Sequence, residues 1–215
     1  MNLARPLILA AVLTAASVAI GAWAYIHLPA GAAFPINYGL DGRPHSYLPK
    51  AEGLGIMPAV AVLVLGIFAT LPLRSRRLAR SADAYGLLVI GLAALFLTAQ
   101  AALIVQAIDP SFDVLRWIYL AAAVLLLLVG NILGKLRQNS VLGVRTRWTR
   151  ADARVWDKTH RFAGRAMVAG ALVLAAVALF VPDHRLLIAA FVLAVAGPLL
   201  ASAAYSARLG AQPRS

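Results

Sequence analysis

The sequence predicts an all-α integral membrane protein, built as a bundle of six transmembrane helices with a short cytoplasmic amphipathic segment. The 215 residues are 62% hydrophobic and only 13% charged. A soluble domain is usually about half apolar and about a quarter charged. The apolar residues also form long uninterrupted blocks, and the basic residues lie between these blocks. Such a chain is adapted to lipid rather than to water as its solvent.

Six apolar blocks are long enough to cross a bilayer, which takes about 20 helical residues. They are Leu7–Ile26, Leu54–Leu73, Tyr85–Ile108, Leu115–Leu133, Ala163–Val181 and Leu186–Ser206. No block alternates apolar and polar residues as the strands of a membrane barrel do. The first block exceeds the core of a signal peptide, about 7–15 residues, so we expect it to be retained as a helix.

Basic residues are distributed unevenly between the two sides of the predicted bundle. Sixteen of the 20 Lys and Arg residues lie on the side that holds both chain ends and the loops after the second and fourth helices. The other side holds Arg43, Lys50, Arg116 and Arg185. Because cytoplasmic loops carry the excess of basic residues, both termini are predicted in the cytoplasm. The net charge of +12 is therefore assigned to topology and anionic lipid headgroups, and no direct nucleic-acid binding is predicted.

Several classes of site are disfavoured by the residues themselves. The chain has no cysteine, and its four histidines lack metal-ligand spacing, so no metal or cofactor is predicted. Each histidine is expected to be satisfied in the core or exposed to solvent. The central turns of the six blocks contain no Asp, Glu or Lys, which ion-coupled transporters usually need. No catalytic residue is assigned.

The segment between the fourth and fifth blocks is dense in Arg and Trp. A helix-start signal at Thr149 and Asp152 predicts a short amphipathic helix from Arg150 to about Arg161. Trp156 and His160 would share one face of this helix, at i and i+4, and a neighbouring face would hold Arg154, Lys158 and Arg161. Trp beside Arg at a membrane boundary suits an amphipathic interfacial helix. On charge alone, topology and anionic lipid explain the segment, although the planar fork of arginine also suits a phosphate group.

This segment resembles the SdpI family of bacterial membrane proteins. The matching residues are Gly130, Asn131, Lys135, Asn139, Gly143, Arg145, Thr146, Trp148, Thr149, Trp156, Lys158, Thr159, His160, Arg161 and Gly164. Arg147 stands where the family usually has proline. The absence of proline removes the restriction that it would place on the backbone of Thr146. The resemblance implies a candidate cytoplasmic binding site formed by all the matching residues except the three glycines.

The first loop resembles the domain known as DUF1648, which often precedes the SdpI segment. The matching residues are Leu28, Pro29, Pro35, Ile36, Tyr38, Gly42, Pro44, Tyr47 and Lys50, with Asn37 in place of the family's histidine. Candidate extracytoplasmic contact residues are Pro35, Asn37, Tyr38, Gly42, Tyr47 and Lys50. The predicted regions are 1–80 (DUF1648-like, two helices and the loop), 81–113 (third helix and connection) and 114–215 (SdpI-like, three helices and the Arg/Trp loop).

The resemblance implies an immunity or signalling protein of the bacterial cytoplasmic (inner) membrane. The family's founding member protects the producing cell from a secreted toxin and recruits a repressor to the membrane, so a toxin peptide and a cytoplasmic repressor are the implied partners. The residues alone leave another interpretation open. A membrane enzyme, or a binding or transport protein, would act on a lipid phosphate or small solute through the Arg/His/Trp loop, with His160 as acid–base. No carboxylate lies at a spacing from His160 that would indicate a second catalytic group, so catalysis is the less favoured interpretation.

Overall fold

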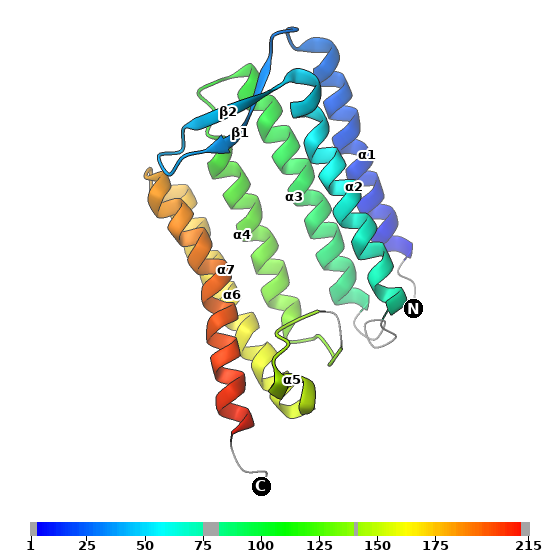
Figure 1. Cartoon of the computed structure of the whole chain (residues 1–215), viewed down its shortest axis with the longest axis vertical. Coiled ribbons are helices and arrows are strands. Elements are labelled where there is room, and N and C mark those ends of the chain that lie inside the picture. The colour runs from blue at the N-terminus through cyan, green and yellow to red at the C-terminus, as the bar shows by residue number, and fades with distance from the viewer. Residues whose placement is uncertain (1–3, 75–81, 140–141, 212–215) are drawn as a thin grey trace.

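The computed structural model describes residues 4–74, 82–139 and 142–211 of the chain. Within these ranges seven helices and two strands follow one another, with both strands between the first two helices (Figure 1). The elements are α1 (Ala4–His27), β1 (Ala33–Tyr38), β2 (Pro44–Pro49), α2 (Lys50–Arg74), α3 (Ala82–Ile108), α4 (Val114–Leu133), α5 (Arg147–Ala151), α6 (Ala153–Phe180) and α7 (His184–Gly210).

Six of these helices are long and apolar enough to cross a membrane, which confirms the prediction of six spans for the described residues. The predicted blocks coincide with α1, α2, α3, α4, α6 and α7. The one residue that falls outside its helix is Val181, which caps the C-terminus of α6.

The separate amphipathic helix predicted from Arg150 to Arg161 is wrong. Residues 153–161 form the first part of α6, which runs without a break to Phe180. The helix begins where the side chain of Asp152 accepts a hydrogen bond from the backbone N–H of Arg154 and so caps the N-terminus. Because no residue interrupts the helix after this cap, the basic turns and the apolar span form one rigid rod.

The six long helices pack as two groups of three that meet along α3 and α4. One group contains α1, α2 and α3, and the other contains α4, α6 and α7 (Figure 1). Figure 1 also shows β1 and β2 lying across one end of the bundle, while the start of α1, the end of α7 and α5 lie at the opposite end. We call these the hairpin end and the basic end.

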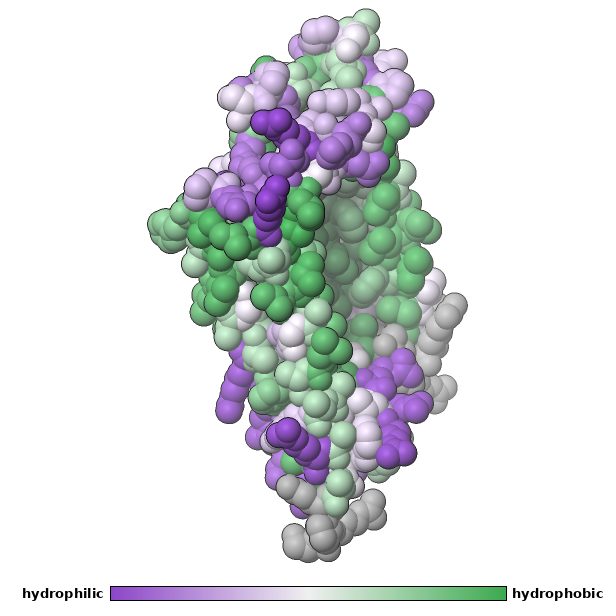
Figure 2. Space-filling model, turned by 60° about the vertical axis from the view of Figure 1, so that its left-hand side comes forward, coloured by the Kyte–Doolittle hydropathy of each residue, from purple (hydrophilic) through white to green (hydrophobic). Residues whose placement is uncertain are grey.

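The surface of the bundle is apolar between two polar ends, as Figure 2 shows. Large side chains such as Leu63, Phe180 and Leu200 are more than 60% exposed along this belt. Small residues are frequent in the interior, and those of α1 that are buried are Ala10, Ser17, Gly21 and Ala24. This distribution is expected in lipid, where large apolar side chains face the acyl chains and small residues let helices approach closely.

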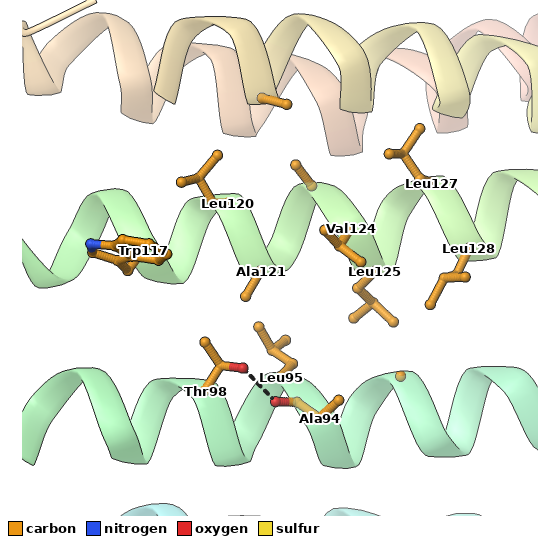
Figure 3. A pocket seen from close by; sticks show the side chains of 13 residues that line it. Ala94, Leu95, Thr98, Trp117, Leu120, Ala121, Val124, Leu125, Leu127 and Leu128 are labelled. Atoms are coloured by element: carbon orange, nitrogen blue, oxygen red, sulfur yellow. Dashed lines mark hydrogen bonds between the residues drawn. The ribbon is translucent and has the colours of Figure 1, made fainter. Parts of the chain in front are cut away.

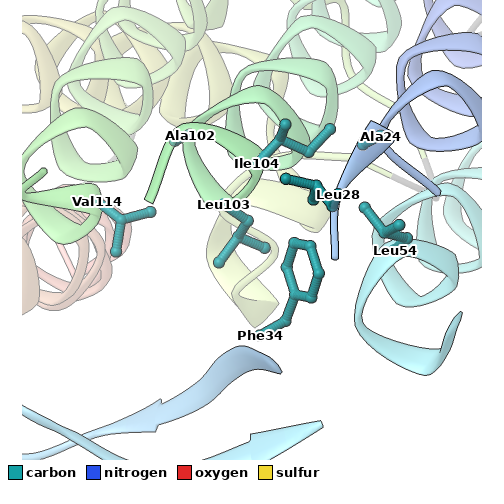
Figure 4. Packing of buried hydrophobic residues seen from close by; sticks show 8 residues of the cluster. All are labelled: Ala24, Leu28, Phe34, Leu54, Ala102, Leu103, Ile104 and Val114. Atoms are coloured by element: carbon teal, nitrogen blue, oxygen red, sulfur yellow. The ribbon is translucent and has the colours of Figure 1, made fainter. Parts of the chain in front are cut away.

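The first loop forms an antiparallel hairpin, an element that the all-α prediction did not include. Ala33 pairs with Pro49 and Pro35 pairs with Tyr47, and the register shifts around Asn37. The hairpin is anchored by Phe34, which is 1% exposed and inserts among residues of α1, α2, α3 and α4 (Figure 4). The chain therefore remains mostly helical, with one small sheet covering the hairpin end.

Cysteine labelling should place the two ends of the bundle on opposite sides of the membrane. The natural chain has no cysteine, so Arg43→Cys at the hairpin end and Arg208→Cys at the basic end each introduce a single exposed thiol. In intact cells an impermeant maleimide should label the Arg43→Cys variant, and it should label the Arg208→Cys variant only after permeabilisation. Labelling of both variants in intact cells would exclude the predicted orientation. The predicted orientation also depends on four basic residues that lie outside the described part of the chain: Arg76, Arg77, Arg80 and Arg214.

Candidate functional site

The connection between α4 and α6, residues 134–152, folds back against the basic ends of α6 and α7. It starts at Gly134, which caps α4, and contains the short helix α5. We call it the α4–α6 connection. Most of the predicted cytoplasmic site residues lie in it or in the first turns of α6, so its internal bonds decide which of them are available to a ligand.

His160 fastens this connection to α6. The backbone N–H of Val144 donates to the Nε2 atom of His160, with an N···N distance of 3.1 Å. Nε2 is thus the acceptor nitrogen, and the proton of the neutral ring lies on Nδ1. Nδ1 is 2.9 Å from the carbonyl oxygen of Trp156, to which it donates. Both ring nitrogens are used, and His160 is 0% exposed.

Gly143 makes this arrangement possible. Its φ angle is +106°, a conformation that glycine adopts easily and that other residues rarely adopt. A Cβ atom at this position would also collide with the Nε2 atom of His160. The glycine therefore allows the chain to turn and the next residue, Val144, to reach the imidazole.

Trp156 is the second buried anchor of the connection. Its indole N–H donates to the carbonyl oxygen of Leu136 at 2.7 Å, and its ring stacks on His160 with 3.9 Å between centroids. Trp156 is 0% exposed. Trp156 and His160 share one helix face as predicted, but the connection folds over this face, so it is buried in the protein and does not lie at a membrane interface.

Threonine hydroxyls hold α5 in place. Thr146 and Thr149 form a reciprocal capping box, in which each side chain bonds the backbone N–H of the other residue. The Thr149 hydroxyl also donates to the carbonyl oxygen of Val144 at 2.8 Å, and the Thr146 hydroxyl is 2.9 Å from the hydroxyl of Ser206 on α7. Arg147, in place of the family's proline, occupies the first position of α5, and the turn is retained because the capping box fixes Thr146.

Two amide side chains complete the connection. The Asn139 amide donates to the carbonyl oxygen of Arg137 and accepts from the backbone N–H of Leu142. The Gln138 amide donates to the last carbonyl groups of α5, those of Thr149 and Arg150, at 2.8 and 3.0 Å. These bonds satisfy backbone groups at a turn and at a helix end that would otherwise have no hydrogen-bond partner.

The helices α4 and α6 cross closely beneath this connection. A Cβ atom on Gly130 would lie 2.9 Å from the Gly164 carbonyl oxygen, and one on Gly164 would lie 2.5 Å from the Gly130 carbonyl oxygen. The backbones therefore touch, and no larger residue fits without separating the helices. The close crossing is what brings Leu136 and Val144 within reach of the first turns of α6.

The predicted cytoplasmic residues fall into two sets in the structure. One set is wholly or partly buried and bonded or packed within the protein: Asn139, Thr146, Trp148, Thr149, Trp156, Thr159 and His160. The other set is exposed: Asn131, Lys135, Arg145, Lys158 and Arg161. The fold therefore brings the aromatic and hydroxyl residues together and leaves the charged residues on the surface around them. Whether either set binds a ligand stays a prediction.

The predicted residues of the first loop are also divided between structural and exposed positions. The Tyr38 hydroxyl donates to the Gln106 side chain on α3, and Lys50 Nζ donates to the Leu28 carbonyl oxygen, both at 2.8 Å. Pro35 is buried, and Gly42 lies against the imidazole of His184. Asn37 bonds Ser46 across the hairpin, and its side chain, like that of Tyr47, is exposed.

A polar cluster at the hairpin end was missed by sequence reasoning. Asp113 caps α4 and accepts from Arg116 Nε at 3.0 Å and from His184 Nε2 at 3.1 Å. Arg116 also donates to the carbonyl oxygens of Ala178 and Val181 at the end of α6. Partial burial raises the pKa of Asp113, but the bonds from His184 and Arg116 outweigh it and hold that pKa below its ordinary value. The sequence does contain a signal for part of this cluster, because an acidic residue just before an apolar block indicates a helix cap.

Two other features of the described residues carry no sign of chemistry. The described residues contain no group of three or more His, Cys, Asp or Glu side chains that could hold a metal. A groove of about 340 Å³ lies between α3 and α4 (Figure 3). Its lining is apolar apart from Thr98, whose hydroxyl donates to the carbonyl oxygen of Ala94 in the preceding turn. Lipid chains can fill such a groove without any specific contact.

The fold and the connection define a multi-pass α-helical membrane protein with an ordered segment at its basic end. In a comparison with known proteins, residues 135–202 are similar to the SdpI/YfhL protein family. A stretch of 69 residues is 32% identical to the Immunity protein SdpI of Bacillus subtilis (strain 168). This alignment covers 32% of the chain and 33% of that relative. No solved structure matches the chain.

The predicted SdpI resemblance is thus confirmed for the part of the chain that contains most of the α4–α6 connection, α6 and much of α7. These matches do not reach the first loop, so its resemblance to DUF1648 stays a prediction. They also do not test the division of the chain into the three predicted regions, which stays a prediction too. The match begins after Asn131, so this candidate residue lies outside it.

Proposed function

We propose that this chain is an immunity protein of the bacterial cytoplasmic membrane, which protects the cell from a secreted toxin. The observation that supports the proposal is the similarity of residues 135–202 to the SdpI/YfhL family and to the Immunity protein SdpI. The matched stretch coincides with the segment in which buried side chains fasten the connection to α6 and α7. A segment with so many specific bonds has a role beyond supplying positive charge.

In this proposal the hairpin end faces outward and meets the toxin. The excess of basic residues at the other end supports this orientation. Ile36, Leu40 and Tyr47 are 40%, 66% and 56% exposed on the hairpin, beside the polar Asn37. Exposed apolar and aromatic side chains on a rigid pair of strands provide a suitable contact surface for an amphipathic peptide.

The basic end would carry any signal into the cell. Arg145, Arg147, Arg150 and Arg154 are all exposed on and around α5. Together they give a positively charged surface on an ordered support, which could hold an acidic face of a cytoplasmic repressor. The support for this role is the charge and the exposure of these four residues.

The catalytic alternative receives no support from the geometry of His160. An acid–base residue needs a ring nitrogen that can reach a substrate. Here one nitrogen accepts from Val144 and the other donates to Trp156, and the ring has no exposed surface. We therefore assign His160 a structural role.

The test uses a Bacillus subtilis strain that lacks its own immunity protein. Expression of this chain should restore survival when the cells are exposed to the toxin of that system, and an empty vector should not. The Tyr47→Ala variant should protect less at an unchanged protein level, because the exposed ring of the hairpin is lost. Killing of cells that contain the correctly inserted chain would refute immunity to that toxin.

A further inference from the structure

A groove runs along the outside of the bundle between α4 and α6, on a face separate from the buried set at His160. Its volume is about 450 Å³. The polar residues at its rim are Asn131, Arg161 and Arg165, and all three are exposed. Its floor is the close helix crossing, where Gly130 and Gly164 leave only backbone.

A second hollow of about 310 Å³ lies on the other side of the same two arginines. It is lined by Lys158, Phe162 and Tyr205 together with Arg161 and Arg165. Arg161 and Arg165 therefore line both hollows. Lys158, Arg161 and Arg165 follow one another at i, i+3 and i+7, so they form one stripe along α6.

This stripe carries positive charge that no acidic side chain of the described residues neutralises. None of the three residues forms an ion pair with an acidic side chain in the described part of the chain. Asp157 lies one turn before Arg161, but Arg161 contacts its backbone carbonyl oxygen, at 3.3 Å, rather than its carboxylate. Three cations at one end of a transmembrane helix make an anion the complementary ligand.

The groove continues from this charged rim into the apolar belt. Val168, Ala169 and Leu172 line it further along α6. At about 1.5 Å per residue, Leu172 lies about 10 Å deeper in the membrane than Arg165. An anion without a tail would use only the rim, whereas a phospholipid has both a charged head and an acyl chain to fill the whole groove.

We propose that this face is a binding site for an anionic phospholipid of the leaflet at the basic end. Arg161 and Arg165 hold the headgroup phosphate, for which their planar forks are suited, and the Asn131 amide donates to it from α4. One acyl chain lies along Val168, Ala169 and Leu172. The bound lipid would bridge α4 and α6 at their crossing. This inference does not rest on the immunity proposal, because it uses only the charge and shape of this face.

The test measures lipid binding to the purified full-length chain by native mass spectrometry, with phosphatidylglycerol and phosphatidylcholine as probes. The natural chain should prefer phosphatidylglycerol. The Arg161→Gln/Arg165→Gln double variant should lose about ten- to a hundred-fold in affinity for it, since hydrogen bonds to charged groups contribute that much. The Arg150→Gln/Arg154→Gln double variant is the matched control. It removes the same charge at the same end but outside the groove, and it should bind as the natural chain does.

Two more variants separate the lipid from a simpler anion and from misfolding. Ala169→Phe should fill the apolar part of the groove and weaken phosphatidylglycerol binding, while glycerol phosphate should not compete for the site. The Arg161→Lys/Arg165→Lys double variant keeps the charge and should retain only part of the preference for phosphatidylglycerol. It replaces the glutamine double variant in the test if the latter does not fold. Equal losses in the groove pair and the control pair would overturn the proposal, because binding would then follow net charge alone. An unchanged affinity of the Ala169→Phe variant for phosphatidylglycerol would contradict the proposed position of the acyl chain.

Discussion

Replacing Gly143 with alanine should destabilise the protein by about 2–5 kcal/mol and detach the α4–α6 connection from α6. Two effects act together. The backbone is held at a φ of +106°, which an alanine adopts only with strain. The new methyl group would also collide with Nε2 of His160. The ring cannot swing away at low cost, because Nδ1 is bonded to Trp156 and its plane is stacked on the indole.

The measurement is thermal unfolding of the detergent-solubilised chain, with tryptophan fluorescence reporting on the burial of Trp156. Gly66→Ala is the matched control, since a Cβ atom placed there would point into open space and meet no other part of the protein. Gly66 lies in the interior of α2, where alanine is the better helix former by about 1 kcal/mol, so this variant should be neutral or slightly more stable. Equal unfolding temperatures for Gly143→Ala and the natural chain would show that the turn at Gly143 does not need glycine.

The His160→Ala change should cost about 3–5 kcal/mol in the free energy of unfolding. It removes a fully buried ring and so leaves a cavity beneath the connection. It also leaves the buried N–H of Val144 without its acceptor. If His160 were a catalytic group, the same change would instead leave stability intact and abolish an activity.

The chain contains its own control for this experiment. Trp23 and His27 have the same spacing as Trp156 and His160, their rings also stack, and Nδ1 of His27 is 2.8 Å from the carbonyl oxygen of Trp23. The difference is that Trp23 and His27 are exposed at the end of α1. His27→Ala should therefore change stability little. A comparable loss in the two variants would mean that the local Trp–His contact, and not the bond to Val144, is what matters at His160.

The repeated Trp–His spacing also shows where sequence reasoning ends. A tryptophan and a histidine four residues apart on a helix share one face, and this local relation follows from the helical period alone. Whether that face is buried depends on which segment of the chain returns to cover it. At His160 the connection does so, because the glycine crossing of α4 and α6 brings Leu136 and Val144 to the first turns of α6.

For the same reason, only the tertiary structure shows which residues of the predicted cytoplasmic site are buried and which are exposed. From sequence, Arg145, Trp156 and His160 belonged to one matching pattern, with no information on which side chains point inward. In the structure Trp156 and His160 are core residues of the connection, and Arg145 is exposed. Arg165 and Tyr205 were not among the predicted site residues, yet they line the same hollow as Arg161. No local pattern relates a residue of α7 to one of α6.

The sequence by itself determined the class of the protein. Six long apolar blocks specify membrane helices, because lipid penalises unpaired backbone groups and charge along the whole length of a span. The uneven distribution of basic residues predicts their orientation. The sequence also determined the family resemblance of residues 135–202, since that depends only on residue identities. The tertiary structure alone decided that the first loop is a hairpin anchored by Phe34, that the amphipathic turns belong to α6, and that two arginines border an apolar groove. These features come from contacts between residues far apart in the chain, whose energies depend on how the helices pack and not on any local period.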